Sequence, residues 1–349
     1  MSQTTNSSKV VHLVLTPWNL SDDYNRHAGA TLLSLLENSS LPVIVHLLYD
    51  ANESSGNENG ELYNRKCYQK IADIYGCEVI FHNVEMPLWL KDVPAVKRWT
   101  PGTLMRLYVP DILPDVDKVL YLDCDIIVNL DVKELWDINL DSWILGAVVP
   151  EKHLVSRYNH DKKMRKIYQK FNIDINDYFN AGVLLLNLKS IREVTNRFTS
   201  ELLELLHENP DLPYLNQDLL NIFCKGKYLH LHEKYNIFST HGSVLEYADN
   251  AIIHYAIQEV KPWKRYSEGI DDYYWHYVVK TPWFDDGEKM LKYVRAAVDI
   301  NAALHLLPLY MFSQSETNRV KKAKNILRVS LSMQLKLIIS LVIQIFSKI

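Results

Sequence analysis

The chain contains the stretch Val119-Leu-Tyr-Leu-Asp-Cys-Asp-Ile126, in which two carboxylates end a strongly apolar run. Residues 118–128 otherwise predict a buried parallel strand, because Val, Ile and Leu follow one another without polar alternation. Buried carboxylates must be paired or bound to metal, and two of them about 4 Å apart repel by roughly 4 kcal/mol at an effective dielectric constant of about 20. A divalent cation relieves both costs, since side chains two residues apart on a strand point the same way. Asp123 and Asp125 are therefore predicted metal ligands.

A second acidic triplet, Asp115-Val-Asp117, serves as an internal control for this prediction. It has the same spacing but lies in a polar segment that contains Pro114, so it predicts a solvated loop. The context of the carboxylates, more than their spacing, indicates the metal site.

The composition predicts a soluble globular protein of one large domain or two smaller ones, with 349 residues, 48% of them hydrophobic and 23% charged. A net charge of −4 argues against nucleic acid as a partner. Residues 1–9 lack the apolar segment of a signal peptide. Four cysteines lack metal-finger spacing and favour a reducing compartment: Cys67, Cys77, Cys124 and Cys224. We therefore expect a cytoplasmic protein.

Apolar runs and helical patterns alternate along the chain. Strands are expected at 10–15, 43–49, 78–84, 144–149, 182–187 and 251–255, and helices at 27–38, 61–75, 102–109, 158–170, 188–208 and 216–225. This alternation predicts an α/β fold with a mostly parallel central sheet and helices on both faces. Ligands of such sheets bind at the carboxyl ends of the strands, where Asp123 and Asp125 fall.

The C-terminal residues 319–349 have a different character. Basic residues dominate 319–328, and Leu, Ile and Val dominate 329–346, with Lys336 interrupting the apolar run. This run is near the lower limit for a membrane span. A basic segment beside an apolar helix favours a peripheral anchor at the inner face of the membrane. The alternative is a helix docked on the catalytic domain, or on a second subunit of a homo-oligomer.

Single polar residues at the ends of elements are further candidates. His254 follows a short apolar strand, and imidazole with two carboxylates suits Mn²⁺, although a structural hydrogen bond explains a lone histidine as well. Lys261 precedes Pro-Trp263 and presents a cation that could meet phosphate. Arg106, on the helix before the acidic strand, predicts either a surface ion pair or a diphosphate contact.

Two amide-containing motifs complete the set. In Tyr178-Phe-Asn-Ala-Gly182, a small-residue turn before a strand would let the backbone approach a ligand, while Asn180 offers a donor and an acceptor. A tight strand-entry turn explains the same residues equally well. Asn216-Gln-Asp218 opens an apolar helical run, so Asn216 is expected to be the N-cap.

Taken in order, these motifs resemble the family-8 glycosyltransferases, a retaining group that includes bacterial lipopolysaccharide galactosyl- and glucosyltransferases and glycogenin. The resemblance covers roughly residues 10–280. It implies the GT-A fold; we expect the catalytic domain at 9–283 and a helical C-terminal region at 284–349. It rests on the first-strand loop, Arg106, Tyr121-Leu-Asp-Cys-Asp125, Phe179-Asn-Ala-Gly182, Asn216-Gln-Asp218 and His254-Tyr255 with Lys261-Pro-Trp263.

The resemblance implies a divalent cation and a UDP-sugar donor. Asp123, Asp125 and His254 would hold Mn²⁺ or Mg²⁺, with Asp123 also on the donor side. Lys261 would contact the phosphates, and Arg106 the nucleotide or the sugar. Metal and lysine would stabilise the charge that develops on a leaving diphosphate.

The same resemblance implies the residues around the donor sugar. Asn180 and Ala181 would line the sugar, and Gln217 would lie on the reacting face of the anomeric carbon, beside Asn216. No Asp or Glu of these motifs is an obvious nucleophile, so retention by same-face attack is favoured.

Three positions depart from the family pattern. Asn216 stands where aspartate is common, which argues against a carboxylate nucleophile there. The segment from His254 to Lys261 lacks a glycine and is one residue longer than usual. The first-strand loop is also long, and it leaves open whether Asp22 or Asp23 faces uridine.

The sequence thus predicts a retaining, metal-dependent transferase that moves glucose or galactose from a UDP-sugar to a glycan or lipid-linked glycan. The first alternative is a non-catalytic nucleotide-sugar-binding protein on the same fold. The second is a nucleotidyltransferase, but the segment after the first strand, Leu15-Thr-Pro-Trp-Asn-Leu20, lacks the glycine-rich phosphate loop of that class.

Overall fold

The computed structural model divides into two compact units, Met1–His254 and Tyr255–Ile349. It describes residues 10–22, 24–50, 52, 58–150, 155–264 and 266–285. The domain boundary predicted after residue 283 falls inside the second unit and stays a prediction. Asp23 and the C-terminal segment 319–349 lie outside the described residues.

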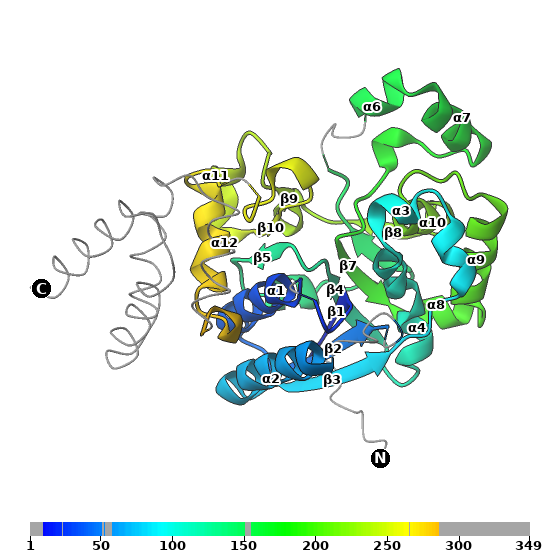
Figure 1. Ribbon diagram of the computed structural model, residues 1–349. Coiled ribbons are helices and arrows are strands. Elements are labelled where there is room, and N and C mark those ends of the chain that lie inside the picture. Colours follow the sequence, from blue (N-terminus) through cyan, green and yellow to red (C-terminus); the bar gives the residue numbers. More distant parts are fainter. Residues whose placement is uncertain are drawn as a thin grey trace, which may run out of the picture. The chain divides into compact units, whose positions relative to one another are not determined.

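Within the described residues of the first unit, a central sheet has the strand order β3-β2-β1-β4-β7-β6-β8 (Figure 1). β7 runs antiparallel to both of its neighbours, β4 and β6, and the other neighbouring pairs are parallel. The prediction of a mostly parallel sheet is confirmed. The strands are β1 (Val11–Trp18), β2 (Val43–Tyr49), β3 (Glu78–Asn83), β4 (Lys118–Leu122), β6 (Leu145–Ala147), β7 (Val183–Asn187) and β8 (Tyr228–His230).

Helices cover both faces of this sheet (Figure 1). α1 (Asn25–Asn38) and α2 (Glu58–Tyr75) lie on one face, and α8 (Leu188–Val194), α9 (Phe198–Glu208) and α10 (Asn216–Phe223) lie on the other. Strands covered on both sides need apolar residues at consecutive positions, which explains the unbroken apolar runs that the sequence shows.

The remaining elements are short. In the described part of the chain, no helix combines the length and the apolar character that a membrane span needs. The shorter helices are α3 (Val96–Trp99), α4 (Val109–Ile112), α5 (Lys133–Trp136), α6 (Val155–His160), α7 (Lys162–Lys170), α11 (Val244–Tyr247) and, in the second unit, α12 (Ile270–Val278). The 3₁₀ segments are Leu88–Asp92, Pro101–Tyr108, Ile175–Asp177, Glu233–Tyr235, Ala248–Asn250, Gln258–Val260 and Pro282–Asp285.

The expectation of one strand over 118–128 is wrong. β4 ends at Leu122, the chain turns through residues 123–125, and β5 (Ile126–Val128) joins a second sheet with β9 (Ile237–Phe238) and β10 (Ile252–His254). A turn at this point keeps the two carboxylates out of a ladder that is covered by apolar layers on both faces. β10 pairs antiparallel with β5 and sets His254 opposite Ile126, directly beside the acidic turn.

Three predicted helices also differ from the structure. The helix expected at 158–170 is divided into α6 and α7 at Asp161, whose side chain caps α7 by accepting the backbone N–H of Met164 (3.0 Å). The segment 102–109 is a 3₁₀ helix at Pro101–Tyr108 rather than an α-helix. The long helix expected at 188–208 is split into α8 and α9, because the Thr195 hydroxyl accepts the backbone N–H of Arg197 (2.9 Å) and ends the continuous helical ladder.

Three histidines form a ladder across neighbouring parallel strands of the central sheet. His46 Nε2 lies 3.0 Å from His12 Nδ1, and His46 Nδ1 lies 3.0 Å from His82 Nε2. His46 is 3% exposed. Burial, then the neighbouring imidazoles of His82 and His12, lowers the pKa of His46 from 6.5 to about 3. The ladder is therefore neutral in the folded protein at physiological pH.

The histidine ladder predicts a loss of stability in acid. Because the folded-state pKa is depressed, the stabilisation is present above pH 6.5 and is lost as pH falls toward the folded pKa. Between about pH 5.5 and 4 the unfolded chain binds one more proton at His46, so its contribution to the free energy of unfolding falls by about 1.4 kcal/mol per pH unit. Urea unfolding across this range should show a shallower pH slope for His46→Leu than for the wild type.

The matched control for this experiment is His207→Leu, which removes an exposed histidine from α9. It should leave the pH slope of the wild type in place. Equal slopes for the wild type and His46→Leu would show that the ladder does not govern acid stability.

Candidate metal and donor site

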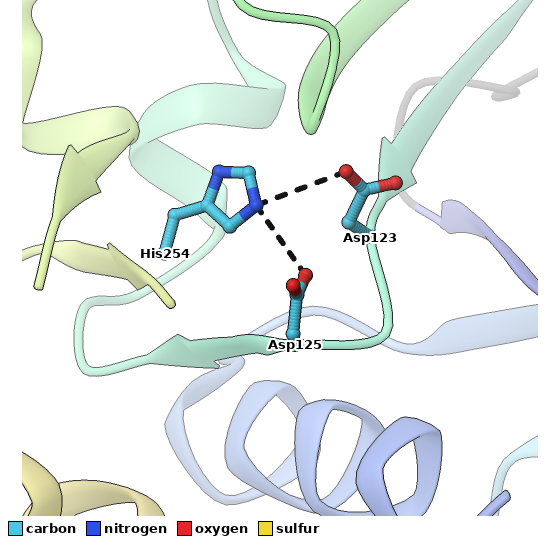
Figure 2. A group of neighbouring side chains, drawn as sticks. All are labelled: Asp123, Asp125 and His254. Carbon is cyan, nitrogen blue, oxygen red and sulfur yellow. Dashed lines mark ion pairs between the residues drawn. The ribbon is translucent and has the colours of Figure 1, made fainter. Parts of the chain in front are cut away.

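Asp123, Asp125 and His254 converge at the carboxyl end of β4 (Figure 2). His254 Nε2 lies 3.7 Å from an oxygen of Asp123 and 3.3 Å from an oxygen of Asp125. One ligand atom from each residue lies within 4.8 Å of the others. The three predicted metal ligands are thus brought together, two from the turn after β4 and one from the last residue of β10.

The chemistry of this cluster fits a divalent cation. Carboxylate oxygens suit Mg²⁺ and Mn²⁺, and an added imidazole nitrogen favours the softer of the two. Cys124 lies between the acids, but burial, followed by the charges of Asp123 and Asp125, raises the pKa of its thiol well above the ordinary value. Among the described residues, the ligand atoms that converge are those of Asp123, Asp125 and His254, and the thiol of Cys124 is not one of them.

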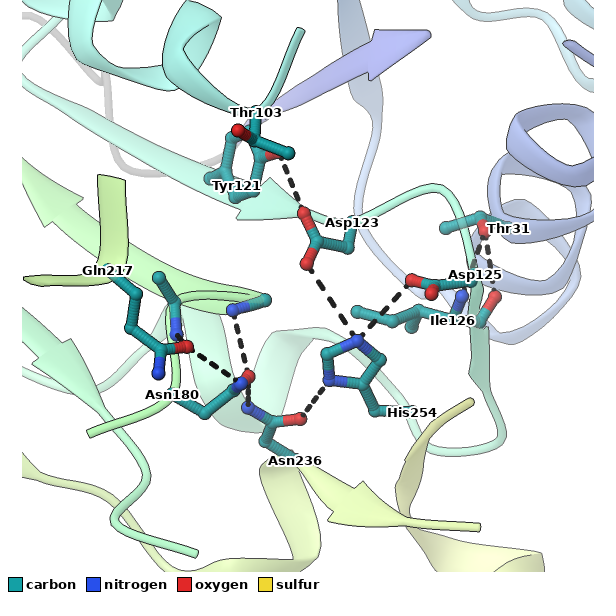
Figure 3. Close-up of polar contacts among 12 residues, drawn as sticks. Thr31, Thr103, Tyr121, Asp123, Asp125, Ile126, Asn180, Gln217, Asn236 and His254 are labelled. Atoms are coloured by element: carbon teal, nitrogen blue, oxygen red, sulfur yellow. Dashed lines mark hydrogen bonds and ion pairs between the residues drawn. The ribbon is translucent and has the colours of Figure 1, made fainter. Parts of the chain in front are cut away.

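The Asp123 side chain is held from one side. Its Oδ1 accepts hydrogen bonds from Arg106 Nη2 (2.7 Å) and from the Tyr121 hydroxyl (2.9 Å), while its other oxygen faces His254 (Figure 3). The Tyr121 hydroxyl is itself 2.9 Å from Thr16 Oγ1. This arrangement orients Asp123 so that Oδ2 is turned toward the place where a metal would bind.

Arg106 is buried, which excludes the surface ion pair that its sequence position had left open. Burial disfavours its charge, but the adjacent Asp123 carboxylate outweighs that effect and raises the Arg106 pKa. The guanidinium lies over the Tyr121 ring at 4.3 Å and donates to the carbonyl oxygen of Ala181. Arg106 therefore connects a metal ligand to the segment predicted to line the donor sugar.

The predicted donor-sugar segment and the start of α10 are in direct contact. Gln217 Oε1 accepts hydrogen bonds from Asn180 Nδ2 (3.0 Å) and from the backbone N–H of Ala181 (3.1 Å). The side chain of Asn221 binds both backbone groups of Phe179 at 3.0 Å. These bonds fix the turn that contains Asn180 and Ala181 against α10.

The expectation that Asn216 caps α10 is wrong. Asn216 is the first residue of the helix, the residue before it is Leu215 at φ 44°, and no side chain caps the helix end. The amide orientation that satisfies both groups places the Asn216 oxygen 3.0 Å from Arg106 Nε. In that orientation the same oxygen accepts the backbone N–H of Gln217 (3.2 Å), so the buried Asn216 contacts both the arginine and the first turn of α10.

The loop after β1 brings an aromatic side chain to the site. Asp22 Oδ1 accepts the backbone N–H of Tyr24 at 2.8 Å and so shapes this loop, whereas Asp23 lies outside the described residues. Tyr24 is 37% exposed. Burial of its hydroxyl, followed by the charge of Asp125, raises the Tyr24 pKa well above its ordinary value. Tyr24 lies in the first-strand loop, and only the fold shows its proximity to the acids.

Lys261 belongs to the second unit. It is buried, and its ammonium lies 5.5 Å from the centre of the Trp263 ring. That ring packs against Tyr274 of α12 at 5.3 Å. The predicted phosphate contact of Lys261 stays a prediction.

Asn236 was missed by the sequence reasoning. It is 2% exposed and lies directly before β9, where its side chain contacts His254 and Asn180. No local pattern marks it, because Lys234-Tyr-Asn236 reads as an ordinary polar segment. Its neighbours are 18 and 56 residues away along the chain, so only the fold reveals its position.

The chain is similar in sequence to known glycosyltransferases. Residues 16–267 match the sequence profile described as Glycosyl transferase family 8. General stress protein A of Bacillus subtilis is 25% identical over 79% of this chain and 95% of its own length. Lipopolysaccharide 1,3-galactosyltransferase of Salmonella typhimurium is 26% identical, covering 73% of this chain and 74% of its own.

A solved structure shows the same fold. The galactosyltransferase LgtC, in complex with donor and acceptor sugar analogues, aligns with a TM-score of 0.60 and 22% identity, covering 78% of this chain and 96% of LgtC. The mostly parallel α/β sheet with helices on both faces is the GT-A fold. The chain belongs to glycosyl transferase family 8 and is a glycosyltransferase of the GT-A fold.

Gly182 provides the space for the imidazole of His254. A Cβ atom at Gly182 would lie 2.2 Å from His254 Cε1 and 2.8 Å from Nδ1, far inside van der Waals contact. Gly182→Ala should therefore displace the ring and weaken Mn²⁺ binding by about 10-fold or more, in the range seen when the support of a ligand is lost. Titration with Mn²⁺ followed by electron paramagnetic resonance measures this affinity.

Gly242→Ala is the matched control, since none of the described atoms lies within 4 Å of a Cβ added there. It should bind Mn²⁺ as the wild type does. Unchanged affinity in Gly182→Ala would contradict the role of the glycine in placing His254.

Proposed function

We propose that this protein is a retaining glycosyltransferase that moves glucose or galactose from a UDP-sugar, with Mn²⁺ or Mg²⁺, to a glycan or lipid-linked glycan. The observation that carries the proposal is the cluster of Asp123, Asp125 and His254 on a family-8 chain, joined through Arg106 to the Asn180–Ala181 turn. Lipopolysaccharide hexosyltransferases among the relatives support the hexose and the glycan.

The proposed division of work follows from charge. Asp123, Asp125 and His254 would hold the cation, which when bound supplies charge stabilisation to a leaving diphosphate. Lys261 would contribute a second positive charge to the phosphates, and Asp23 or Asp22 a contact to uridine. The exposed Tyr24 beside the acids offers an aromatic face for a base.

The burial and hydrogen bonding of Asp218, which follows Gln217 in the sequence, support retention by same-face attack. Asp218 is 0% exposed, and its oxygens accept hydrogen bonds from the Tyr168 and Tyr178 hydroxyls (2.7 and 2.6 Å) and from the Tyr214 N–H (2.7 Å). Burial raises the Asp218 pKa to about 6 although the tyrosines act in the opposite sense. A carboxylate so enclosed by donors is a poor nucleophile.

The side-chain oxygen of Gln217, Oε1, is also occupied by hydrogen bonds. It accepts two hydrogen bonds, from Asn180 Nδ2 and from the backbone of Ala181, and its other amide atom is a donor. These contacts support a role for Gln217 in holding the sugar. With Asn180, Ala181 and Asn216, it would position the donor while the acceptor attacks on the side of the leaving group.

The first prediction from this proposal concerns donor hydrolysis. UDP release from UDP-glucose and UDP-galactose should require Mn²⁺, stop with EDTA, and fall by about 100-fold or more in Asp125→Asn, because metal stabilisation of a leaving group contributes several kcal/mol. The faster donor identifies the sugar. A coupled assay for UDP measures the rates.

Asp115→Asn is the matched control, since it alters the other Asp-x-Asp triplet, in which Asp115 is exposed. It should retain the wild-type rate. Metal-independent release would contradict the metal chemistry. A third result would favour the non-catalytic binding protein. In that case calorimetry detects UDP binding, but neither sugar is hydrolysed from its donor and neither is transferred to a lipid-linked glycan.

The second prediction concerns location. We propose that the protein is cytoplasmic and attaches peripherally to the inner face of the membrane through 319–349, whose basic and apolar sequence supports this role. Deletion of 316–349 should abolish sedimentation with vesicles containing anionic lipid and leave the binding of UDP intact. Equal sedimentation of both proteins would favour the alternative, a helix packed on protein, and equilibrium ultracentrifugation then tests for a homo-oligomer.

A further inference from the structure

Asn236 links a proposed metal ligand to the proposed donor-sugar turn (Figure 3). Its Oδ1 lies 2.9 Å from His254 Nδ1, and its Nδ2 donates to Asn180 Oδ1 at 2.8 Å. Asn236 and His254 are each 2% exposed. Both bonds are therefore shielded from water, where the loss of a hydrogen-bond partner is costly.

The direction of this chain of hydrogen bonds is fixed by the backbone. The N–H of Gly182 donates to Asn180 at 2.9 Å, so the accepting atom of Asn180 must be its oxygen. The atom of Asn236 that faces this oxygen must then be its NH₂ group. The other amide atom of Asn236, its oxygen, faces His254, and His254 Nδ1 must carry the hydrogen.

The tautomer of His254 determines whether its second ring nitrogen, Nε2, can bind a metal beside Asp123 and Asp125. With the hydrogen on Nδ1, Nε2 presents its lone pair toward Asp123 and Asp125, the geometry that a shared cation requires. A free histidine has no such fixed assignment, and a hydrogen on Nε2 would block the ligand position. The ring is also held by the edge-to-face packing of Phe238 at 5.4 Å.

We propose that Asn236 is a positioning residue that fixes His254 in the Nδ1–H tautomer and thereby prepares Nε2 to bind the metal. The inference rests on the proposed metal-dependent function. The same amide also holds Asn180, whose Nδ2 binds Gln217, so one side chain aligns the metal side and the sugar side of the site.

Two substitutions separate these contacts. Asn236→Leu removes both the acceptor for His254 and the donor to Asn180. Asn236→Asp keeps an acceptor for His254 Nδ1–H but loses the donor to Asn180. Asn129→Leu is the control, because it removes another amide hydrogen bond, to the carbonyl oxygen of Ala248, near the small sheet and away from His254.

The first experiment measures Mn²⁺ affinity of the full-length chain by electron paramagnetic resonance, with thermal denaturation as a check of folding. Asn236→Leu should weaken binding by about 10- to 100-fold, the range for lost support of a ligand. Asn236→Asp should restore the affinity to within a few-fold of the wild type, and Asn129→Leu should not change it. Wild-type affinity in a folded Asn236→Leu protein, or no restoration in Asn236→Asp, would overturn the proposal.

The second experiment reads the tautomer without metal. Histidine labelled with ¹⁵N should give a protonated Nδ1 and an unprotonated Nε2 for His254, assigned by the loss of the signal in His254→Gln. Asn236→Leu should shift this signal toward the Nε2–H form. If the wild type binds no Mn²⁺ but shows the Nδ1–H signal, the metal function fails and the role of Asn236 stands; a Nε2–H signal in the wild type overturns that role.

Discussion

Two carboxylates and one imidazole lie within 4.8 Å of one another, and the surrounding structure serves to hold these like-charged and lone-pair-bearing groups together. Asp123 is partly balanced by Arg106, which is itself buried and ionised because of that carboxylate. Asp125 faces the same imidazole, with His254 Nε2 lying 3.3 Å from its Oδ1. The divalent metal that we propose for this site would offset the repulsion between the two carboxylates, because a buried carboxylate needs a pairing charge or a metal.

The end of β4 before Asp123 allows the two carboxylates and the imidazole to come together. A continuous strand would have carried Asp125 on into the central sheet, whereas the turn directs the chain into β5 and its antiparallel partner β10. The imidazole comes from the end of β10, and Gly182 leaves the space that the ring occupies. His254 lies 129 residues after Asp125 in the sequence, and strand pairing brings it to the acidic turn. Hydrogen bonds within a single helix or strand could not bring two such distant residues together.

The sequence predicts the structural features that depend on local composition. It does not predict the features that depend on contacts between residues distant in sequence. Apolar runs of consecutive Val and Leu were enough to predict the sheet, and the polar break within one run was enough to single out the two carboxylates that converge with His254. The turn at Asp123 and the antiparallel direction of β7 depend on pairing partners that are distant in sequence. Asn216 was misassigned as a cap, because its buried partner, Arg106, is 110 residues away. Asn236 carried no signal at all, since its role arises only from the positions of His254 and Asn180.

The two sides of the site differ in chemistry, and this difference bears on retention. The metal side is charged, while the sugar side is built from the neutral amides of Asn180, Gln217 and Asn236, whose oxygens are engaged in hydrogen bonds. The Asp218 carboxylate accepts hydrogen bonds from three donors. It is therefore not available to stabilise positive charge that would develop at an anomeric carbon beside these amides. In the proposed mechanism, the departing diphosphate on the metal side would provide negative charge on that face of the sugar. This arrangement supports the proposed attack on the face that the leaving group occupies, in which the amides would hold the sugar and the metal side would hold the diphosphate.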